Sequence, residues 1–169
     1  MITAGLSLAK AALLACLALG LTSCAEKPPV TGGVAPFYRH LDRQDAAVDA
    51  QAAAEILSAY RRNHGLAPLT LDPALSAAAQ ASASAAARAD KPASADALKA
   101  RLAGSGVRSP GANLSAGYRT LAEAFSGWRE SPQHNRVLLQ RSATRFGIAT
   151  AYAPGSKYRV YWALVVAAD

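Results

Sequence analysis

An alternating pattern of apolar residues near the C-terminus constrains the fold more than any other feature of the sequence. Alternation runs through Phe146, Ile148, Thr150 and Tyr152, then resumes after a Pro154-Gly155-Ser156 turn through Tyr158, Val160, Trp162, Leu164 and Val166. Two such segments joined by a short turn predict a β-hairpin. The second segment also carries Tyr161, Ala163, Val165 and Ala167 at the intervening positions. Because both of its faces are apolar or small, this strand is expected to be central and covered on both sides by helices.

Apolar residues upstream of the hairpin repeat with the spacing of helices instead. The expected helices cover 45–64, a long alanine-rich segment that begins at Asp72-Pro73, a short segment around 96–102, a segment capped by Thr120, and a turn after Ser131-Pro132. Alanine occupies little volume, so the alanine-rich helix is expected to lie close to its neighbours. Helices packed around an antiparallel sheet define an α+β fold, here a three-layer α-β-α sandwich with a small antiparallel sheet.

Two local features of these elements are specific enough to predict contacts. Thr120 and Glu123 have the spacing of a capping box, in which the two side chains satisfy backbone donors at a helix start. Trp128 and Trp162 fall on apolar faces, where an indole ring is expected to be buried and its N–H to find a partner.

The N-terminal segment has the order of an export signal. Lys10 precedes an apolar run over 11–21, which is too short to span a bilayer. The run ends in Leu21-Thr22-Ser23-Cys24, which resembles the lipobox of bacterial lipoproteins. This resemblance implies cleavage before Cys24 and a lipid such as palmitate on Cys24. The alternative is a plain secretory signal with Cys24 near its cleavage site.

These features divide the chain into three parts. They are a lipoprotein signal peptide at 1–23, the lipidated Cys24 with a flexible tether at 24–46, and a folded domain at 47–169. Cys16 lies in the segment to be removed, so the mature chain has no disulfide and the domain must be held together by packing.

The chain carries a formal net charge of +7, which favours acidic partners such as anionic lipid headgroups or cell-wall polymers. Its basic residues are scattered, without a dense Lys/Arg block and with few aromatic residues between them. Nucleic acid is therefore not expected as a partner.

Five groups of residues, taken together and in this order, resemble the CAP superfamily of cysteine-rich secretory, antigen 5 and pathogenesis-related 1 proteins. The groups are Tyr60 to Leu69, Leu75 to Gln80, Gly111 to Gly117, Trp128 to His134, and Phe146 to Ala149 with Tyr161-Trp162. The resemblance covers about 48–167 and is greater to the disulfide-free bacterial branch. It implies the same α-β-α sandwich as the residue patterns do.

The same resemblance implies a shallow cleft, which in the family often holds two His and one or two Glu residues that can bind a divalent metal. His134 matches the second His, but the family's Gly-Glu-Asn stands here as Gly111-Ala112-Asn113, without the carboxylate. No His occurs near 91–95, where the first is expected, and Glu130 is only a neighbour of the second acidic position. The family's proposed activities range from proteolysis to sterol or lipid binding.

A zinc site needs at least three protein ligands. The mature chain offers only three histidines, His40, His64 and His134. His40 lies in the tether and His64 at a helix end, so the three are not expected to meet at one metal ion. No metal, cofactor or catalytic residue is therefore predicted. Ser115 and Ser131 are conceivable nucleophiles near His134 by spacing alone.

The predicted ligand cleft consists of His134, Asn113 and Ser131. Two of these residues have a simpler alternative role. His134 can cap or pack at the start of a short helix, and Asn113 can serve as a turn residue that bonds neighbouring peptide groups.

These observations favour a non-catalytic binding module of the cell envelope, anchored through lipid on Cys24. The domain is expected to face the periplasm or the exterior, and to be held at the outer membrane if the host has two membranes. Its expected partners are the membrane and a small amphipathic or envelope ligand. Two alternatives remain open at this point. One is a hydrolase that acts on peptide or cell-wall material, and the other is a structural partner of another envelope protein.

Overall fold

The strand β4 (Val160–Ala168) is central in the sheet, as its two apolar faces predict. In the computed structural model, which describes residues 33–169, all nine residues of β4 are buried. The sheet has four strands in the order β1-β3-β4-β2. The other strands are β1 (Thr70–Leu71), β2 (Arg108–Ala116) and β3 (Arg145–Tyr152).

The expected hairpin is confirmed, but the sheet is mixed rather than wholly antiparallel. Both β3 and β2 pair antiparallel with β4. The short strand β1 pairs parallel with β3, with Thr70 opposite Arg145 and Leu71 opposite Phe146. A parallel pair needs a long crossover, and the helices and the strand between β1 and β3 provide one. The apolar hairpin pattern carries no information about this partner strand.

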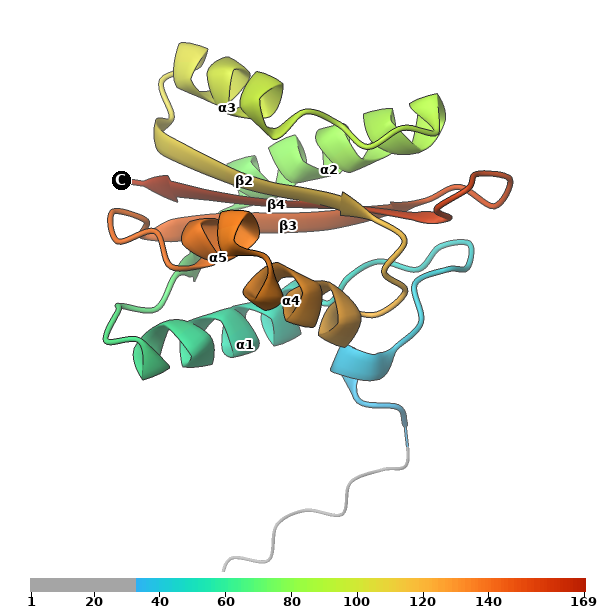
Figure 1. The fold of residues 1–169 in the computed structure, drawn as a ribbon, viewed down its shortest axis with the longest axis horizontal. Helices are drawn as coiled ribbons and strands as arrows, with labels where there is room; N and C mark the ends of the chain where they lie inside the picture. Colours follow the sequence, from blue (N-terminus) through green and yellow to red (C-terminus); the bar gives the residue numbers. More distant parts are fainter. Residues whose placement is uncertain (1–32) are drawn as a thin grey trace, which may run out of the picture. The chain divides into compact units, whose positions relative to one another are not determined.

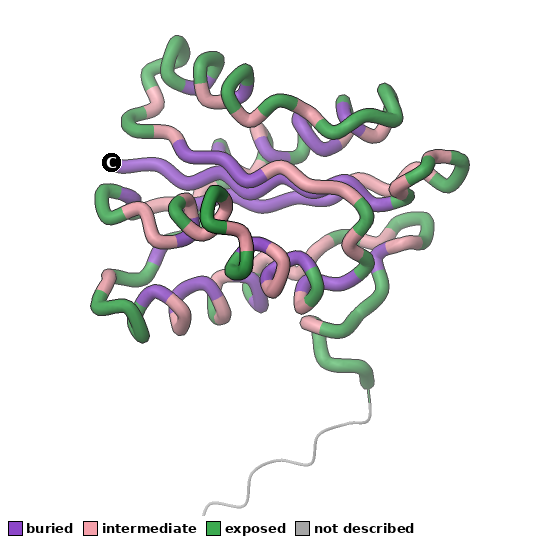
Figure 2. Tube along the Cα trace, in the orientation of Figure 1, coloured by how far each residue is buried: buried purple, intermediate pink, exposed green. Residues whose placement is uncertain are grey.

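Helices cover both faces of the sheet (Figure 1). The helices α2 (Pro73–Ala89) and α3 (Ala95–Gly104) lie on one face, and α1 (Ala50–Asn63), α4 (Leu121–Glu130) and α5 (Pro132–Leu138) lie on the other. Two apolar clusters fill the spaces between the layers, and burial is concentrated along the strands (Figure 2). The three-layer α-β-α sandwich predicted from the sequence is therefore confirmed.

The alanine-rich helix α2 lies in close contact with β3, as its composition predicts. A Cβ atom added to Gly147 would come within 2.2 Å of the Leu75 backbone carbon and the Ser76 backbone nitrogen. Small residues on both elements therefore set the distance between this helix and the sheet.

The strand β2 is not predicted by the sequence patterns. Ser109 has a φ of 47°, and the pairing with β4 shifts register between Arg108 and Gly111. This β-bulge, together with Pro110, interrupts the regular alternation that marks a strand.

The first helix starts later than its apolar spacing suggests. It begins at Ala50, because the Asp49 side chain accepts a hydrogen bond from the Ala52 N–H and caps it. The compact unit itself begins at Val34, so residues 34–46, assigned above to the tether, lie within it. Leu41 is only 3% exposed, and its N–H donates to the carbonyl of Arg119.

The predicted cap and the predicted buried tryptophans are present. Thr120 Oγ1 accepts from the Glu123 N–H, while the Glu123 carboxylate accepts from the N–H of Arg119 rather than of Thr120. Trp128 and Trp162 are each 1% exposed, and their rings meet edge to face. Among residues 33–169 no helix has the length and hydropathy of a membrane span.

Candidate functional site

The structure brings His134, Asn113 and Ser131 together where β2, an edge strand, meets α5. Asn113 Nδ2 donates to the backbone carbonyl of His134 over 3.0 Å. Ser131 caps α5, and its Oγ accepts from the His134 N–H over 3.5 Å. Both contacts involve the backbone of His134, so they fix the start of α5 and leave the imidazole free of them.

Asn113 is a buried strand residue and not the turn residue considered above. Its side chain is fully buried, and within the described chain its Oδ1 atom has no hydrogen-bond partner. A buried carbonyl oxygen without a donor is uncommon and costs free energy. It leaves an acceptor available beside α5.

The His134 imidazole is not arranged as a catalytic base. Burial lowers its pKa, so the ring is neutral near pH 7. Ser131 Oγ is engaged in the helix cap, and Ser115 Oγ accepts the indole N–H of Trp128 over 3.1 Å. In the described part of the chain no hydrogen bond joins the imidazole to either hydroxyl. Nucleophilic catalysis requires a nucleophile within reach of its base, so this arrangement does not support it.

The position that carries a carboxylate in the family lies in the core. Ala112 pairs with Val165 of β4 and is 5% exposed, within the apolar cluster under α2 and α3. Successive strand residues face opposite sides, so Ala112 and Asn113 belong to different faces of the sheet. Glu130 is exposed, and residues 33–169 contain no group of three metal-ligating side chains.

A groove between α1 and α4 offers a second candidate site. Its volume is about 320 Å³, and its lining is Phe37, Tyr38, Ile56, Ala59, Tyr60, Asn63, Ala122, Phe125, Ser126 and Arg129. The Arg129 guanidinium carbon lies 5.9 Å from the centre of the Tyr60 ring and 5.7 Å from that of Phe125. The groove therefore combines aromatic walls with a cation at its rim.

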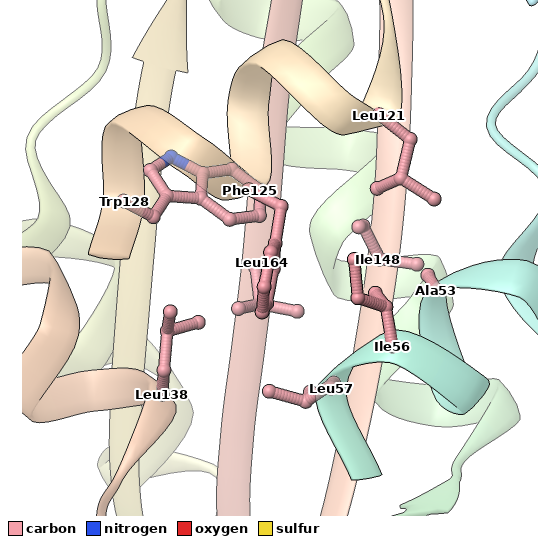
Figure 3. A pocket seen from close by; sticks show the side chains of 9 residues that line it. All are labelled: Ala53, Ile56, Leu57, Leu121, Phe125, Trp128, Leu138, Ile148 and Leu164. Atoms are coloured by element: carbon pink, nitrogen blue, oxygen red, sulfur yellow. The ribbon is translucent and has the colours of Figure 1, made fainter. Parts of the chain in front are cut away.

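A small apolar cavity lies behind this groove, between α1, α4, α5 and the sheet (Figure 3). Its volume is about 10 Å³, at the lower limit of the space that one water molecule needs, and its walls are almost wholly apolar. Ile56 and Phe125 line both the cavity and the groove. These two side chains therefore separate the open groove from the interior.

The sequence patterns miss the groove because its parts come from distant segments. Tyr60 and Phe125 are identified by helical spacing as members of apolar faces, but they are 65 positions apart in the sequence. Their edge-to-face contact, with ring centres 5.4 Å apart, appears only when α1 and α4 pack side by side. The one available signal is that each of the two apolar stripes carries an aromatic residue.

Comparison with known proteins identifies the family. The model of the CAP group, the cysteine-rich secretory protein family, matches residues 55–166. The match covers more than half of the chain, so the protein belongs to this family. A search among curated proteins found no match.

Three solved bacterial structures share the fold. A cysteine-rich secretory protein of Staphylococcus aureus is 18% identical with a TM-score of 0.58, and the match covers 70% of this chain and 38% of that one. An extracellular protein of Bacillus anthracis with an SCP domain is 20% identical with a TM-score of 0.59, over 70% and 40% of the two chains. An outer surface protein of Borrelia burgdorferi is 13% identical with a TM-score of 0.61, over 73% and 97%. The chain thus spans about two fifths of the first two proteins and nearly all of the third.

Proposed function

We propose that this protein is a membrane-tethered, non-catalytic CAP-domain lipoprotein of the bacterial cell envelope that binds a small amphipathic or envelope ligand. The observation that carries the proposal is the chemistry of the residues around His134. Ala112 occupies the carboxylate position as a core residue, and within residues 33–169 the half-buried His134 belongs to no group of three metal-ligating side chains. Binding requires neither a metal nor a nucleophile.

The groove between α1 and α4 supports an amphipathic ligand. Its walls carry the rings of Tyr60 and Phe125 beside the aliphatic Ile56, and such surfaces accept an apolar group. Arg129 is exposed at the rim and supplies a fixed positive charge for an anionic group. A molecule with an apolar part and an anionic head matches both features.

The envelope location rests on two supports. The Bacillus anthracis structure is described as an extracellular protein and the Borrelia burgdorferi structure as an outer surface protein. The segment Leu21 to Cys24 supplies the proposed anchor, although it lies outside the described residues. The net charge of +7 also suits a surface of anionic lipid or wall polymer.

The ligand proposal is tested by filling the groove. Ala122 lines it and is half-buried, so Ala122→Trp adds a large side chain there without removing a core residue. Ala77→Trp on the exposed side of α2 is the matched control. The full chain carrying Cys24→Ser is purified without detergent, and its organic extract is examined by mass spectrometry.

We expect a co-purifying amphipathic molecule in the parent chain and in Ala77→Trp, and its loss in Ala122→Trp. Retention of the same molecule in Ala122→Trp would place the ligand elsewhere. Turnover of peptide or cell-wall substrates by the purified chain would favour the hydrolase alternative and contradict the proposal.

The anchor is tested separately through Cys24. Substitution of Cys24 by Ser removes the thiol that would carry the lipid, so the protein is expected in the soluble or unprocessed pool. Mass spectrometry of the wild-type N-terminus is expected to show an acylated cysteine. A mature Cys24→Ser protein that still partitions with membranes would show that the anchor lies elsewhere.

A further inference from the structure

The two edges of the sheet are unlike. The β2 edge has a β-bulge at its start, and α3 and α5 both pack against it. At the opposite edge, β1 is regular, and both Thr70 and Leu71 are exposed. Proteins normally protect an edge strand by a bulge, a covering element or charged side chains, because its free backbone groups pair with other strands. In this sheet β2 has a bulge and two covering helices, whereas β1 has only its length of two residues and its contact with α1, which leave Thr70 and Leu71 exposed.

The hydrogen bonds of β1 show which of its backbone groups are free. The Thr70 N–H donates to the carbonyl of Thr144 over 2.9 Å, and the Asp72 N–H donates to that of Phe146 over 2.8 Å. In a parallel ladder alternate residues bond to the same neighbour. The N–H and C=O groups of Leu69 and Leu71 therefore point away from β3; Leu71 is 37% exposed, whereas Leu69 is 5% exposed and is reached only through the groove that it lines.

A groove runs between this edge and the outer face of α1. Its volume is about 540 Å³, and its lining includes Ala54, Glu55, Ser58 and Arg62 of α1 and Leu69 to Leu71. Leu71 is 37% exposed, which is unusual here for a large apolar side chain. Glu55 and Arg62 form no ion pair with any described residue. The edge thus presents free backbone groups, an apolar side chain and two unpaired opposite charges.

We propose that β1 pairs with the β1 strand of a second copy of this chain, antiparallel and about a two-fold axis at Thr70. Leu69 of each copy then lies opposite Leu71 of the other, and each of these two pairs exchanges two backbone hydrogen bonds. The two four-stranded sheets become one continuous sheet. Such an interface is isologous, because the same surface is used on both copies.

The charges on α1 are what favour a second copy over an unrelated strand. Glu55 and Arg62 are seven positions apart on α1, so they lie on one face about two helical turns from each other. A two-fold axis perpendicular to the sheet sets the two α1 helices antiparallel on the same side. Glu55 of each copy then faces Arg62 of the other, which forms two opposite-charge pairs.

A cysteine at the axis tests the geometry. Thr70 faces its own equivalent as a non-hydrogen-bonded pair, with a Cα separation of about 4.5 Å. That separation lies in the range that a disulfide can bridge. In membranes that contain the full chain, Thr70→Cys is expected to form covalent dimers under mild oxidation, and the exposed control Ala77→Cys is not. Equal cross-linking of the two variants, or none at Thr70→Cys, would overturn the proposal.

Exchanging the charges at Glu55 and Arg62 tests whether these two residues pair between the two copies. The measurement is sedimentation of the detergent-solubilised full chain. The single variants Glu55→Arg and Arg62→Glu each turn both opposite-charge pairs of the dimer into like-charge pairs. Each is therefore expected to weaken dimerisation roughly tenfold. The double variant Glu55→Arg with Arg62→Glu restores the pairs and is expected to restore the wild-type dimer. Both positions are exposed, so the fold should tolerate these changes. A wild-type chain that stays monomeric, or a double variant no better than the single ones, would contradict the proposal.

Discussion

The side-chain amide of Asn113 donates a hydrogen bond to the backbone carbonyl of His134 over 3.0 Å. The bond ties the edge strand β2 to α5, a helix of only seven residues. It fixes the start of that helix at the point where the family has a metal-binding histidine. The residue that organises this site is therefore the buried Asn113, which holds the backbone of His134 and not its imidazole.

Replacing Asn113 by alanine should destabilise the domain by about 1 to 3 kcal/mol, because the half-buried carbonyl of His134 would lose the hydrogen bond that the fully buried Asn113 side chain donates. His134→Ala keeps that carbonyl and its bond, and it should cost less. The free energies of unfolding of both variants are measured by denaturant titration monitored by circular dichroism. A His134→Ala variant that loses as much stability as Asn113→Ala would show that the imidazole itself holds the site together.

Trp162→Ala should cost about 3 to 5 kcal/mol, a large part of the roughly 5 to 15 kcal/mol that stabilises a domain. Trp162 is 1% exposed, packs edge to face with Trp128, and donates its indole N–H to the Tyr118 carbonyl over 2.8 Å. Tyr38→Ala is the control, since Tyr38 is 64% exposed. A Trp162→Ala melting temperature within a degree or two of wild type would contradict the account.

The C-terminal hairpin and the helices were predictable because each has a regular apolar period and recognisable caps. Trp162 and Val165 of β4 show this, since alternation alone placed them on opposite buried faces. The strand β2 was not predictable, because Ser109 and the bulge after Arg108 break the alternation. The two-residue strand β1 is too short to show any period.

The candidate site was predictable in part. Spacing within the family motifs suggested that His134, Asn113 and Ser131 lie together, and the structure places them so. The motif spacing did not reveal that Asn113 is buried, because burial depends on how α5 packs over β2. The groove beside Arg129 was also missed, since it forms only where two distant helices meet.

The pair formed by Asp72 and Arg145 should make stability fall in acid. The Leu75 N–H, and then the Arg145 guanidinium at 2.5 Å, lower the pKa of Asp72. A depressed folded-state pKa adds stability above the unfolded value of about 3.9, and this stability is lost as the pH falls through the folded-state pKa. Asp72→Asn keeps a good helix cap but removes the charge, so it should cost about 1 kcal/mol at pH 7 and much less in strong acid.

The control for this prediction is Asp96→Asn. Asp96 also has a lowered pKa, because Lys99 bonds and attracts its carboxylate, but its side chain is 91% exposed. Its replacement should leave the free energy of unfolding nearly unchanged at both pH values. A difference between wild type and Asp72→Asn that is the same at neutral and acid pH would show that the ion pair contributes nothing.

Zinc binding tests most directly the claim that this domain acts by binding and not by metal-dependent catalysis. One half-buried imidazole cannot hold zinc tightly, because affinity requires several ligands in a fixed geometry. Calorimetry on the chain from Ala25 onward, at micromolar concentration, should show no stoichiometric zinc binding, and His134→Ala should leave that result unchanged. Ala112→Glu should not create a site, since residue 112 belongs to the apolar cluster beneath α2 and α3. One zinc per chain in the wild type, lost on replacing His134, would contradict the account and make a metal-dependent enzyme the better explanation.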